Sequence, residues 1–182
     1  MDLLEAIRGR RSVRSYKVDP IPEKKLKVVL EAVRWAPSWA NTQCWEVIVV
    51  RDQQTKRKLV DTLSKGNPSR EAILQAPLTL VLLGIEGRAG FYKGEVCTEK
   101  GDWYMFDVGL AMQNLCLAAH AMGLGTVIVG YFDAAKVAEI LQVPPGRAVV
   151  AMTPLGYPKE VPPPPKRKEI EEFVHYEEYG SR

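Results

Sequence analysis

Residues 103–122, WYMFDVGLAMQNLCLAAHAM, are the longest regular apolar segment of the sequence, and they decide which fold the rest can adopt. One face at helical spacing consists of Phe106, Leu110, Gln113 and Leu117. The apolar surface is extended around the cylinder by Met105, Met112, Leu115 and Ala119. Twenty residues at a rise of 1.5 Å give a helix of about 30 Å. A helix that is apolar on all sides must be buried, and in so small a domain we expect a second subunit to supply part of its cover.

The flanking segments predict an alternation of helices and strands, with Gly123 as the helix C-cap and Asp133 as an N-cap. Helices are predicted at 3–9, 22–36, 54–63 and 133–140. Strands are predicted at 45–50, 78–85, 126–129 and 149–155. We expect one domain over residues 1–182, with a proline-rich arm at 157–168 and a C-terminal helical extension at 169–180.

Composition excludes several classes of protein. The net charge of +3, from 25 basic and 22 acidic residues, gives no support for binding to nucleic acid. Three cysteines without a CxxC pair, together with two histidines, give no scaffold for a zinc site or a disulfide framework. The N-terminus lacks a signal-peptide pattern, and the longest apolar run, 78–85, is too short to cross a bilayer. We therefore expect a cytoplasmic protein with no metal and no membrane contact.

The segment Arg10-Arg11-Ser12-Val13-Arg14-Ser15-Tyr16 concentrates positive charge. If it is extended, Arg10, Ser12 and Arg14 point the same way, and two guanidinium groups flanking a hydroxyl match the oxygens of a phosphate. A solvated basic turn would have the same sequence, so the segment alone leaves both interpretations open.

Two other segments also allow both a ligand-binding interpretation and a purely structural one. The loop 36–45, APSWANTQCW, offers the amide donors and acceptors of Asn41 and Gln43 to a heterocycle edge, although Ser and Asn are also common in turns. The cations 166–168 follow the proline arm, and they form either a second anion contact or a charged linker.

The glycines of 123–130, GLGTVIVG, do not form a dinucleotide fingerprint, because they follow a helix and open a strand. Gly130 can still allow backbone to approach a flat ligand. No GxSxG elbow, P-loop or acid–base pair is evident, and His120 is interpreted as structural. If the protein is an enzyme, we expect a cofactor and no side chain to carry the chemistry.

In combination and in this order, these segments resemble the nitroreductase family of flavin mononucleotide (FMN) enzymes. The resemblance rests on RRSVR (10–14), PSWANTQCW (37–45), MGLGT (122–126), IVG (128–130), LGYP (155–158) and RK (167–168) before IEEFVHYEEYG (170–180). It implies an α+β three-layer sandwich, in which a mainly antiparallel sheet is flanked by helices. It also implies an intertwined homodimer with two FMN molecules in its interface.

The resemblance further implies that NADH or NADPH is the co-substrate. Hydride passes to flavin N5, and electrons then pass to nitroaromatics, quinones or similar small acceptors. The alternative is a flavin-binding electron-transfer protein without NAD(P)H-dependent turnover. A third hypothesis makes the basic N-terminus a nucleic-acid contact, which the modest net charge opposes.

Residue roles follow from the same resemblance. The FMN contacts would be Arg10, Arg11, Ser12 and Arg14, with Arg10 on the phosphate, Arg14 towards the N1/O2 edge and Arg167 as a second phosphate contact. The partner chain's FMN would be reached by Pro37, Ser38, Asn41 and Gln43. The ring would be covered by Ile128, Val129 and Gly130.

Three features depart from the family pattern. Cys44 stands where many members have proline, and the stretch 86–101, which helps to shape the substrate pocket in larger members, is short. Arg70 is a weak candidate for a further family cation. These departures bear on the substrate more than on the cofactor.

Overall fold

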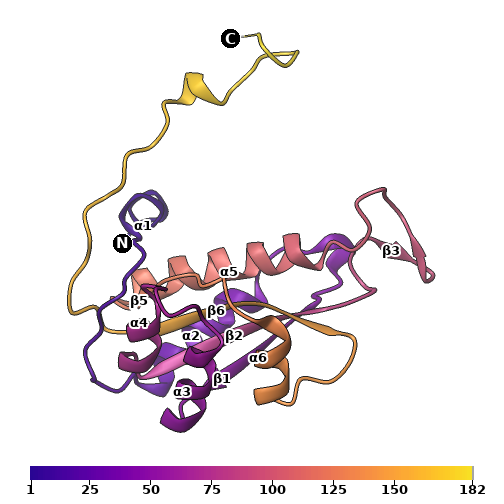
Figure 1. The fold of residues 1–182 in the computed structure, drawn as a ribbon. Coiled ribbons are helices and arrows are strands. Elements are labelled where there is room, and N and C mark those ends of the chain that lie inside the picture. Colours follow the sequence, from indigo (N-terminus) through magenta and orange to yellow (C-terminus); the bar gives the residue numbers. More distant parts are fainter. Residues whose placement is uncertain (182) are drawn as a thin grey trace.

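A four-stranded antiparallel sheet organises the chain, which the computed structural model describes over residues 1–181. Its strands lie in the order β1-β2-β6-β5 (Figure 1). Their bounds are β1 Trp45–Val50, β2 Leu78–Ile85, β5 Gly125–Thr126 and β6 Arg147–Gly156. A separate two-stranded hairpin consists of β3 Phe91–Tyr92 and β4 Glu95–Val96.

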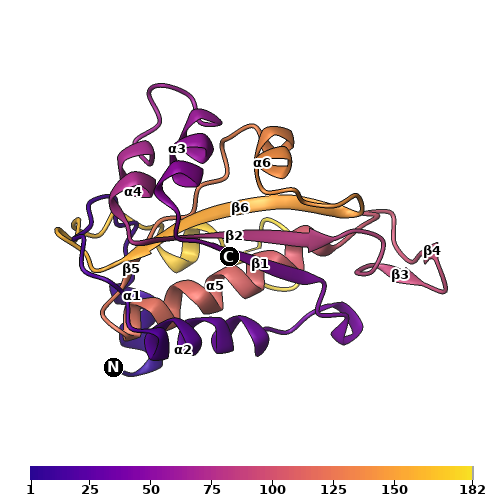
Figure 2. The ribbon, with the colours of Figure 1, turned by 90° about the horizontal axis from the view of Figure 1, so that it is seen from below.

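Helices cover both faces of the sheet, as Figure 2 shows. The helices are α1 Leu3–Gly9, α2 Glu23–Arg34, α3 Gln53–Asp61, α4 Arg70–Gln75, α5 Tyr104–Ala121 and α6 Ala134–Ile140, with 3-10 turns η1 Trp39–Asn41 and η2 Ile170–Glu172. One apolar core lies between the sheet and α2 and α5, and a second lies between the sheet and α3, α4 and α6. The predicted α+β arrangement of an antiparallel sheet flanked by helices is confirmed.

Local sequence signals explain where several helices begin and end. Asp2, Asp52 and Asp133 each accept a backbone N–H in the first turn of the helix that follows, which satisfies an otherwise unpaired donor. At the other end of α5, Gly123 adopts the left-handed conformation with φ 74°, and the next amide returns to the Ala119 carbonyl. The predicted caps at Asp133 and Gly123 are confirmed.

Helix α5 is buried on one side only. Its buried side faces the sheet and α2 and includes Val108, Ala111, Leu115 and Ala119. The opposite side carries Phe106, which is 58% exposed, and Met105, which is 57% exposed. The face predicted from Phe106, Leu110, Gln113 and Leu117 is therefore exposed or only partly covered within one chain.

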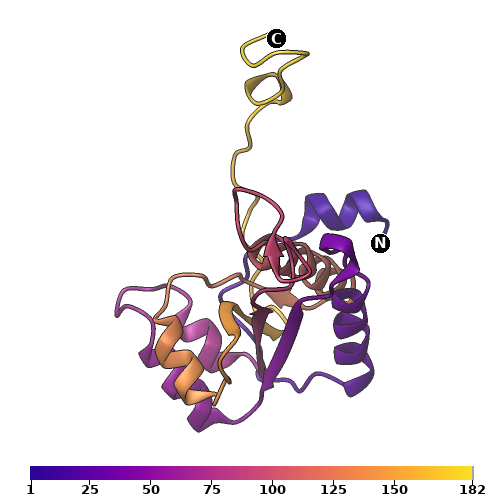
Figure 3. The ribbon, with the colours of Figure 1, turned by 90° about the vertical axis from the view of Figure 1, so that its right-hand side faces the viewer.

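The structure corrects several details of the predicted elements. The strand predicted at 126–129 is only two residues long, and Val129 returns to the sheet through an isolated bridge to Met152. Helix α4 and the β3–β4 hairpin were not predicted. Within 169–180 the structure forms the single 3-10 turn η2 in place of a longer helix, and this part of the chain projects away from the body (Figure 3). None of the helices formed by residues 1–181 is long and apolar enough to cross a membrane.

The N-terminal segment and the proline arm run side by side. Ser12 bridges to Thr126, and the Val13 N–H donates to the Thr126 carbonyl at 2.9 Å, which ties the segment to β5. The Lys17 N–H donates to Tyr157 and the Lys159 N–H to Ser15, both at 2.9 Å. Two stretches at least 140 residues apart in the sequence are thereby held together.

The close approach of Gly125 to Val13 generates a prediction. A Cβ at Gly125 would lie 2.8 Å from the Val13 Cβ, so Gly125→Ala should destabilise the fold by about 1–3 kcal/mol through overpacking. Urea unfolding at fixed protein concentration measures this. Gly66→Ala is the control because no atom lies within 4 Å of its new Cβ. Equal midpoints for the two variants would contradict the proposed close contact.

Candidate functional site

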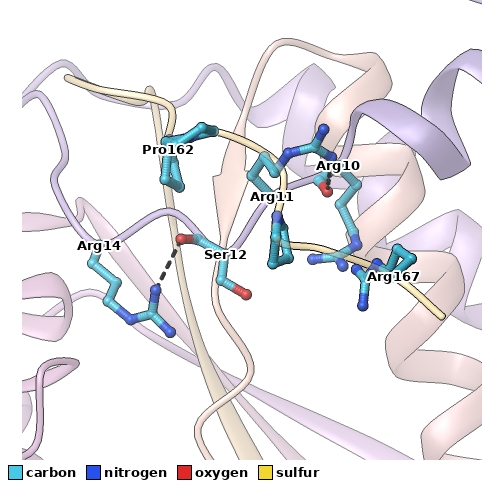
Figure 4. Close-up of a pocket in the computed structure, with 8 residues that line it drawn as sticks. Arg10, Arg11, Ser12, Arg14, Pro162 and Arg167 are labelled. Atoms are coloured by element: carbon cyan, nitrogen blue, oxygen red, sulfur yellow. Dashed lines mark hydrogen bonds between the residues drawn. The ribbon is translucent and has the colours of Figure 1, made fainter.

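A pocket of about 290 Å³ forms where the N-terminal segment meets the proline arm (Figure 4). We call it the arginine pocket, and its lining residues are Arg10, Arg11, Ser12, Arg14, Pro162, Pro163, Pro165 and Arg167. Arg10 and Arg167 approach each other from the two segments. The four N-terminal residues predicted to bind one ligand are thus brought together with the predicted second cation, Arg167.

Two buried residues and a hydrogen bond between them fix the backbone of the N-terminal segment. Val13 and Tyr16 are buried, and the Tyr16 hydroxyl donates to the Val13 carbonyl at 2.8 Å. Burial raises the pKa of Tyr16 well above its ordinary value, which keeps the hydroxyl neutral and able to donate. The intervening residue Arg14 is exposed. Val13 and Tyr16 lie three residues apart, so burial along this segment does not follow the two-residue period expected of a regular extended strand.

The arginine pocket collects positive charge without a counter-ion. Within residues 1–181, no carboxylate forms an ion pair with Arg10, Arg11, Arg14 or Arg167. Arg11 donates to the Arg8 and Arg10 carbonyls at 2.6 and 2.9 Å, and Arg14 donates to the Ser12 carbonyl at 3.3 Å. The described residues offer no hydrogen-bond acceptor to the Arg10 and Arg167 side chains.

The field of this cluster reaches neighbouring groups. The pKa of His120 is lowered first by burial and then by the charges of Arg10 and Arg11. Like charges held this close repel one another, and an anion between them would reverse the sign of that interaction. Guanidinium groups, the Ser12 hydroxyl and free backbone together suit a phosphate.

The second predicted contact region is the loop 37–44 around η1. Its backbone takes left-handed conformations at three residues other than glycine: Ala40 (φ 42°), Asn41 (φ 56°) and Gln43 (φ 47°). The Ser38 Oγ accepts the Gln43 N–H at 2.9 Å, and the Gln43 side-chain amide donates to Asn41 Oδ1 at 3.3 Å. Such strained backbone persists only where surrounding contacts hold it, and it clusters at binding sites.

A buried carboxyl group holds this loop, and sequence analysis missed its role. Asp107 is 1% exposed, and both of its oxygens lie 3.1 Å from the Trp39 backbone nitrogen, which donates to them. The Cys44 thiol donates to Asp107 Oδ2 at 3.3 Å. Burial, reinforced by Asp107, raises the pKa of Cys44 to about 11. The signal in the sequence was an acid at helical spacing with Ala111 and Leu115 on an apolar stripe.

The loop and the arginine pocket lie at opposite ends of α5 within one chain (Figure 1). Trp39 is bonded to Asp107 in the first turn of α5, whereas Gly9, beside Arg10, packs on His120 in the last turn. Thirteen residues of helix separate these points by about 20 Å. One chain alone therefore does not bring the two predicted sets of residues to one place.

The remaining predicted residues have separate locations. Val129 is buried and exchanges backbone hydrogen bonds with Met152, while Ile128 is 50% exposed and Gly130 is exposed. None of the three lines the arginine pocket. Arg70 donates to the Val60 and Leu63 carbonyls at the end of α3, so this candidate cation has a structural role.

Comparison with known proteins identifies a family and several relatives of the chain. A model described as "Nitroreductase family" matches residues 7–157. The chain is 32% identical over 201 residues to "NADH dehydrogenase" of Thermus thermophilus, covering 96% of this chain and 95% of the relative. It is 29% identical over 189 residues to "FMN reductase [NAD(P)H]" of Bacillus subtilis, covering 98% and 74%. A solved nitroreductase family protein from Clostridium novyi NT superposes with a TM-score of 0.79 at 28% identity, covering 100% of this chain and 96% of that one.

The thiol environments lead to a prediction. Cys44 and Cys116 are buried with raised pKa values, and Cys97 is exposed. At pH 8 a chromogenic disulfide reagent should therefore react quickly with one thiol per native chain and with three in denaturant. Cys97→Ser should abolish the fast reaction. Rapid reaction of a second thiol in native protein would contradict the buried placement of Cys44.

Proposed function

The chain belongs to the nitroreductase family of NAD(P)H-dependent flavin oxidoreductases, and from that premise we propose that its flavin is FMN and that its electron acceptors are nitroaromatics, quinones or similar small molecules. The observation that carries the proposal is the arginine pocket, whose cations have no acidic partner within the described residues.

The residues present fit a phosphate-bearing flavin. Arg10 and Arg167 approach each other in the arginine pocket and have no hydrogen-bond acceptor among residues 1–181, so we assign the phosphate to them, and Ser12 adds a hydroxyl. Arg14, which extends along the exposed side of the segment, is assigned to the N1/O2 edge of the ring, and Arg11 adds to the local positive charge. When bound, FMN supplies the hydride and electron transfer that no side chain of this chain supplies.

We assign Ile128–Gly130 to the flavin ring face. The Val129 N–H donates to the Met152 carbonyl at 2.8 Å, whereas the Ile128 and Gly130 N–H groups have no acceptor within the described residues. One of these two amides is then free to donate to a ring nitrogen. The partly exposed Ile128 side chain supplies apolar cover.

The site is proposed to be completed by a second copy of the chain. Phe106 and Met105 on α5, and Leu3, Leu4 and Ile7 on α1, form exposed apolar faces that a monomer would leave in water. An isologous dimer through α5 would bury them and bring each η1 loop to the partner's arginine pocket. Pro37, Ser38, Asn41 and Gln43 would then serve the partner's FMN.

The segment that follows the proline arm adds to the proposed contact between the two chains. Ile170, Phe173 and Tyr176 are exposed on the projecting segment, which therefore has apolar side chains to place on another surface. We propose a single domain over 1–182 whose arm and C-terminal extension intertwine with the partner. With all three cysteines unpaired, a reducing, cytoplasmic location fits.

Anaerobic reduction tests the proposed activity. Purified protein loaded with FMN should lose its oxidised-flavin absorbance on addition of NADH or NADPH and regain it with a quinone or nitroaromatic. FMN that is bound but never reduced by either nucleotide would favour an electron-transfer protein instead. Failure to bind FMN at all would overturn the cofactor assignment.

Removal of Arg10 tests the phosphate contact. Arg10→Ala should weaken FMN binding by about 1.5–3 kcal/mol, or roughly 10- to 150-fold, because a charge-assisted hydrogen bond is lost. Fluorescence titration of FMN into apoprotein gives the dissociation constant. Lys17→Ala, which removes an exposed charge from the same segment, is the control and should have little effect. Equal affinities for both variants would contradict the role of Arg10.

A further inference from the structure

The carboxyl group of Asp107 is buried on the apolar side of α5 and does not line the arginine pocket. Within residues 1–181 it forms no ion pair, and its recorded hydrogen bonds come from the Trp39 backbone and the Cys44 thiol. Burying a polar group without hydrogen bonds is unfavourable by several kcal/mol. Both carboxylate oxygens of Asp107 instead accept hydrogen bonds, and these bonds hold a single loop, the one around η1.

The held loop is short and cannot keep its shape by itself. Ala40, Asn41 and Gln43 are left-handed without being glycine, and η1 has only three residues. Its first N–H group, that of Trp39, points into the protein and has no acceptor except Asp107. The Trp39 ring packs against Trp103 at 5.2 Å between centroids, so the loop is fastened to the start of α5 by both backbone and side chain.

Asp107 holds the η1 loop at both of its ends. Cys44, which follows the loop and begins the approach to β1, donates its thiol hydrogen to the same carboxyl group that accepts from Trp39. The raised pKa of this thiol keeps it a neutral donor at physiological pH. Asp107 thereby joins residues 39 and 44, and the side chains of Ser38, Asn41 and Gln43 lie on the stretch between or beside these two anchors.

We propose that Asp107 is a positioning residue that orders the η1 loop of its own chain for the flavin bound by the partner chain. The inference rests on the proposed function, because the loop has this ligand only in the proposed dimer. Asp107 does not touch the flavin. It acts through the Trp39 N–H and the Cys44 thiol, which fix where Ser38 and Asn41 lie.

Three single substitutions test the hydrogen bonds. Asp107→Asn keeps the shape but replaces one of the two acceptor oxygens by a donor facing the Trp39 N–H, and we expect FMN affinity to fall at least about tenfold. Trp39→Pro removes that N–H at the first position of the turn, where proline is tolerated, and should have a similar effect. Trp39→Ala loses the ring but keeps the N–H, so it should bind FMN more tightly than Trp39→Pro.

A matched carboxyl serves as control. Asp102 also lies beside the start of α5 and accepts two backbone N–H groups, those of Gly87 and Tyr104, but it does not contact the η1 loop. Asp102→Asn should leave FMN affinity within about twofold. Thermal unfolding of each apo-dimer confirms that the variants compared are folded.

Mixed dimers give a measurement that a merely structural role would not affect. One chain carries Asp107→Asn with intact arginines, and the other carries Arg10→Ala and Arg167→Ala with intact Asp107. If the loop serves the partner's flavin, one of the two sites in the mixed dimer has both halves intact. Two affinity tags isolate this species, and we expect it to bind one FMN tightly per dimer, while each parent homodimer binds FMN weakly.

The outcomes separate the inference from the proposed function. A folded Asp107→Asn dimer with wild-type FMN affinity would overturn the positioning role, as would a mixed dimer with no tight site. Either result leaves the wild-type protein's reduction by NADH or NADPH intact. Conversely, wild-type protein that binds FMN but is not reduced by either nucleotide would contradict the proposed activity without affecting the role of Asp107.

Discussion

Helix α5 carries more apolar surface than one chain covers, and most of the other features follow from this constraint. Its inner side is filled by the sheet and α2, which fixes the middle layer of the fold. Its outer side leaves Met105 and Phe106 more than half exposed. The same helix separates the arginine pocket from the η1 loop by most of its length, and for this reason we propose that a second chain against the exposed side completes the site. In this proposal, cofactor binding and association are coupled through one helix.

The arginine pocket and the η1 loop differ in character, because the first is defined by its charge and the second by its strained backbone. The arginine pocket is an accumulation of cations whose mutual repulsion a bound anion would relieve. The η1 loop is nearly free of charge and is instead held in an uncommon backbone conformation by a buried carboxyl group. In the proposed site, the arginine pocket would attract the phosphate, and the η1 loop would present amide and hydroxyl groups in a fixed orientation. Both features are fully formed in the single chain.

The fold was largely predictable because its main elements have strong local signals. The bounds of β1 and β2 match the predicted strands, because a continuous apolar run with turn residues at its two ends is typical of a buried strand. Helix α5 differs from its prediction by one residue at each end. The misses are elements that depend on tertiary contacts. Helix α4 has six residues and β5 has two, and the segment after the arm projects away from the other described residues, so no packing against them stabilises a longer helix there.

The site was predictable only in part, for a related reason. Arg10, Arg14 and Arg167 were evident as clustered charges in the sequence, although only the pairing of residues 15–17 with 157–159 shows why they meet. The left-handed conformations of Ala40 and Gln43 have no signal in residue type, since glycine and asparagine usually mark such positions. Asp107 was visible as an acid on an apolar stripe, but its partners, Trp39 and Cys44, lie more than sixty residues earlier in the sequence.

The coupling of cofactor binding to association can be measured directly by analytical ultracentrifugation of the FMN-loaded protein, with detection of flavin and protein absorbance across a dilution series. The account predicts two FMN per dimer, with flavin released over the same range of concentrations in which dimers dissociate. Monomers that retain one tightly bound FMN each would contradict a site divided between two chains.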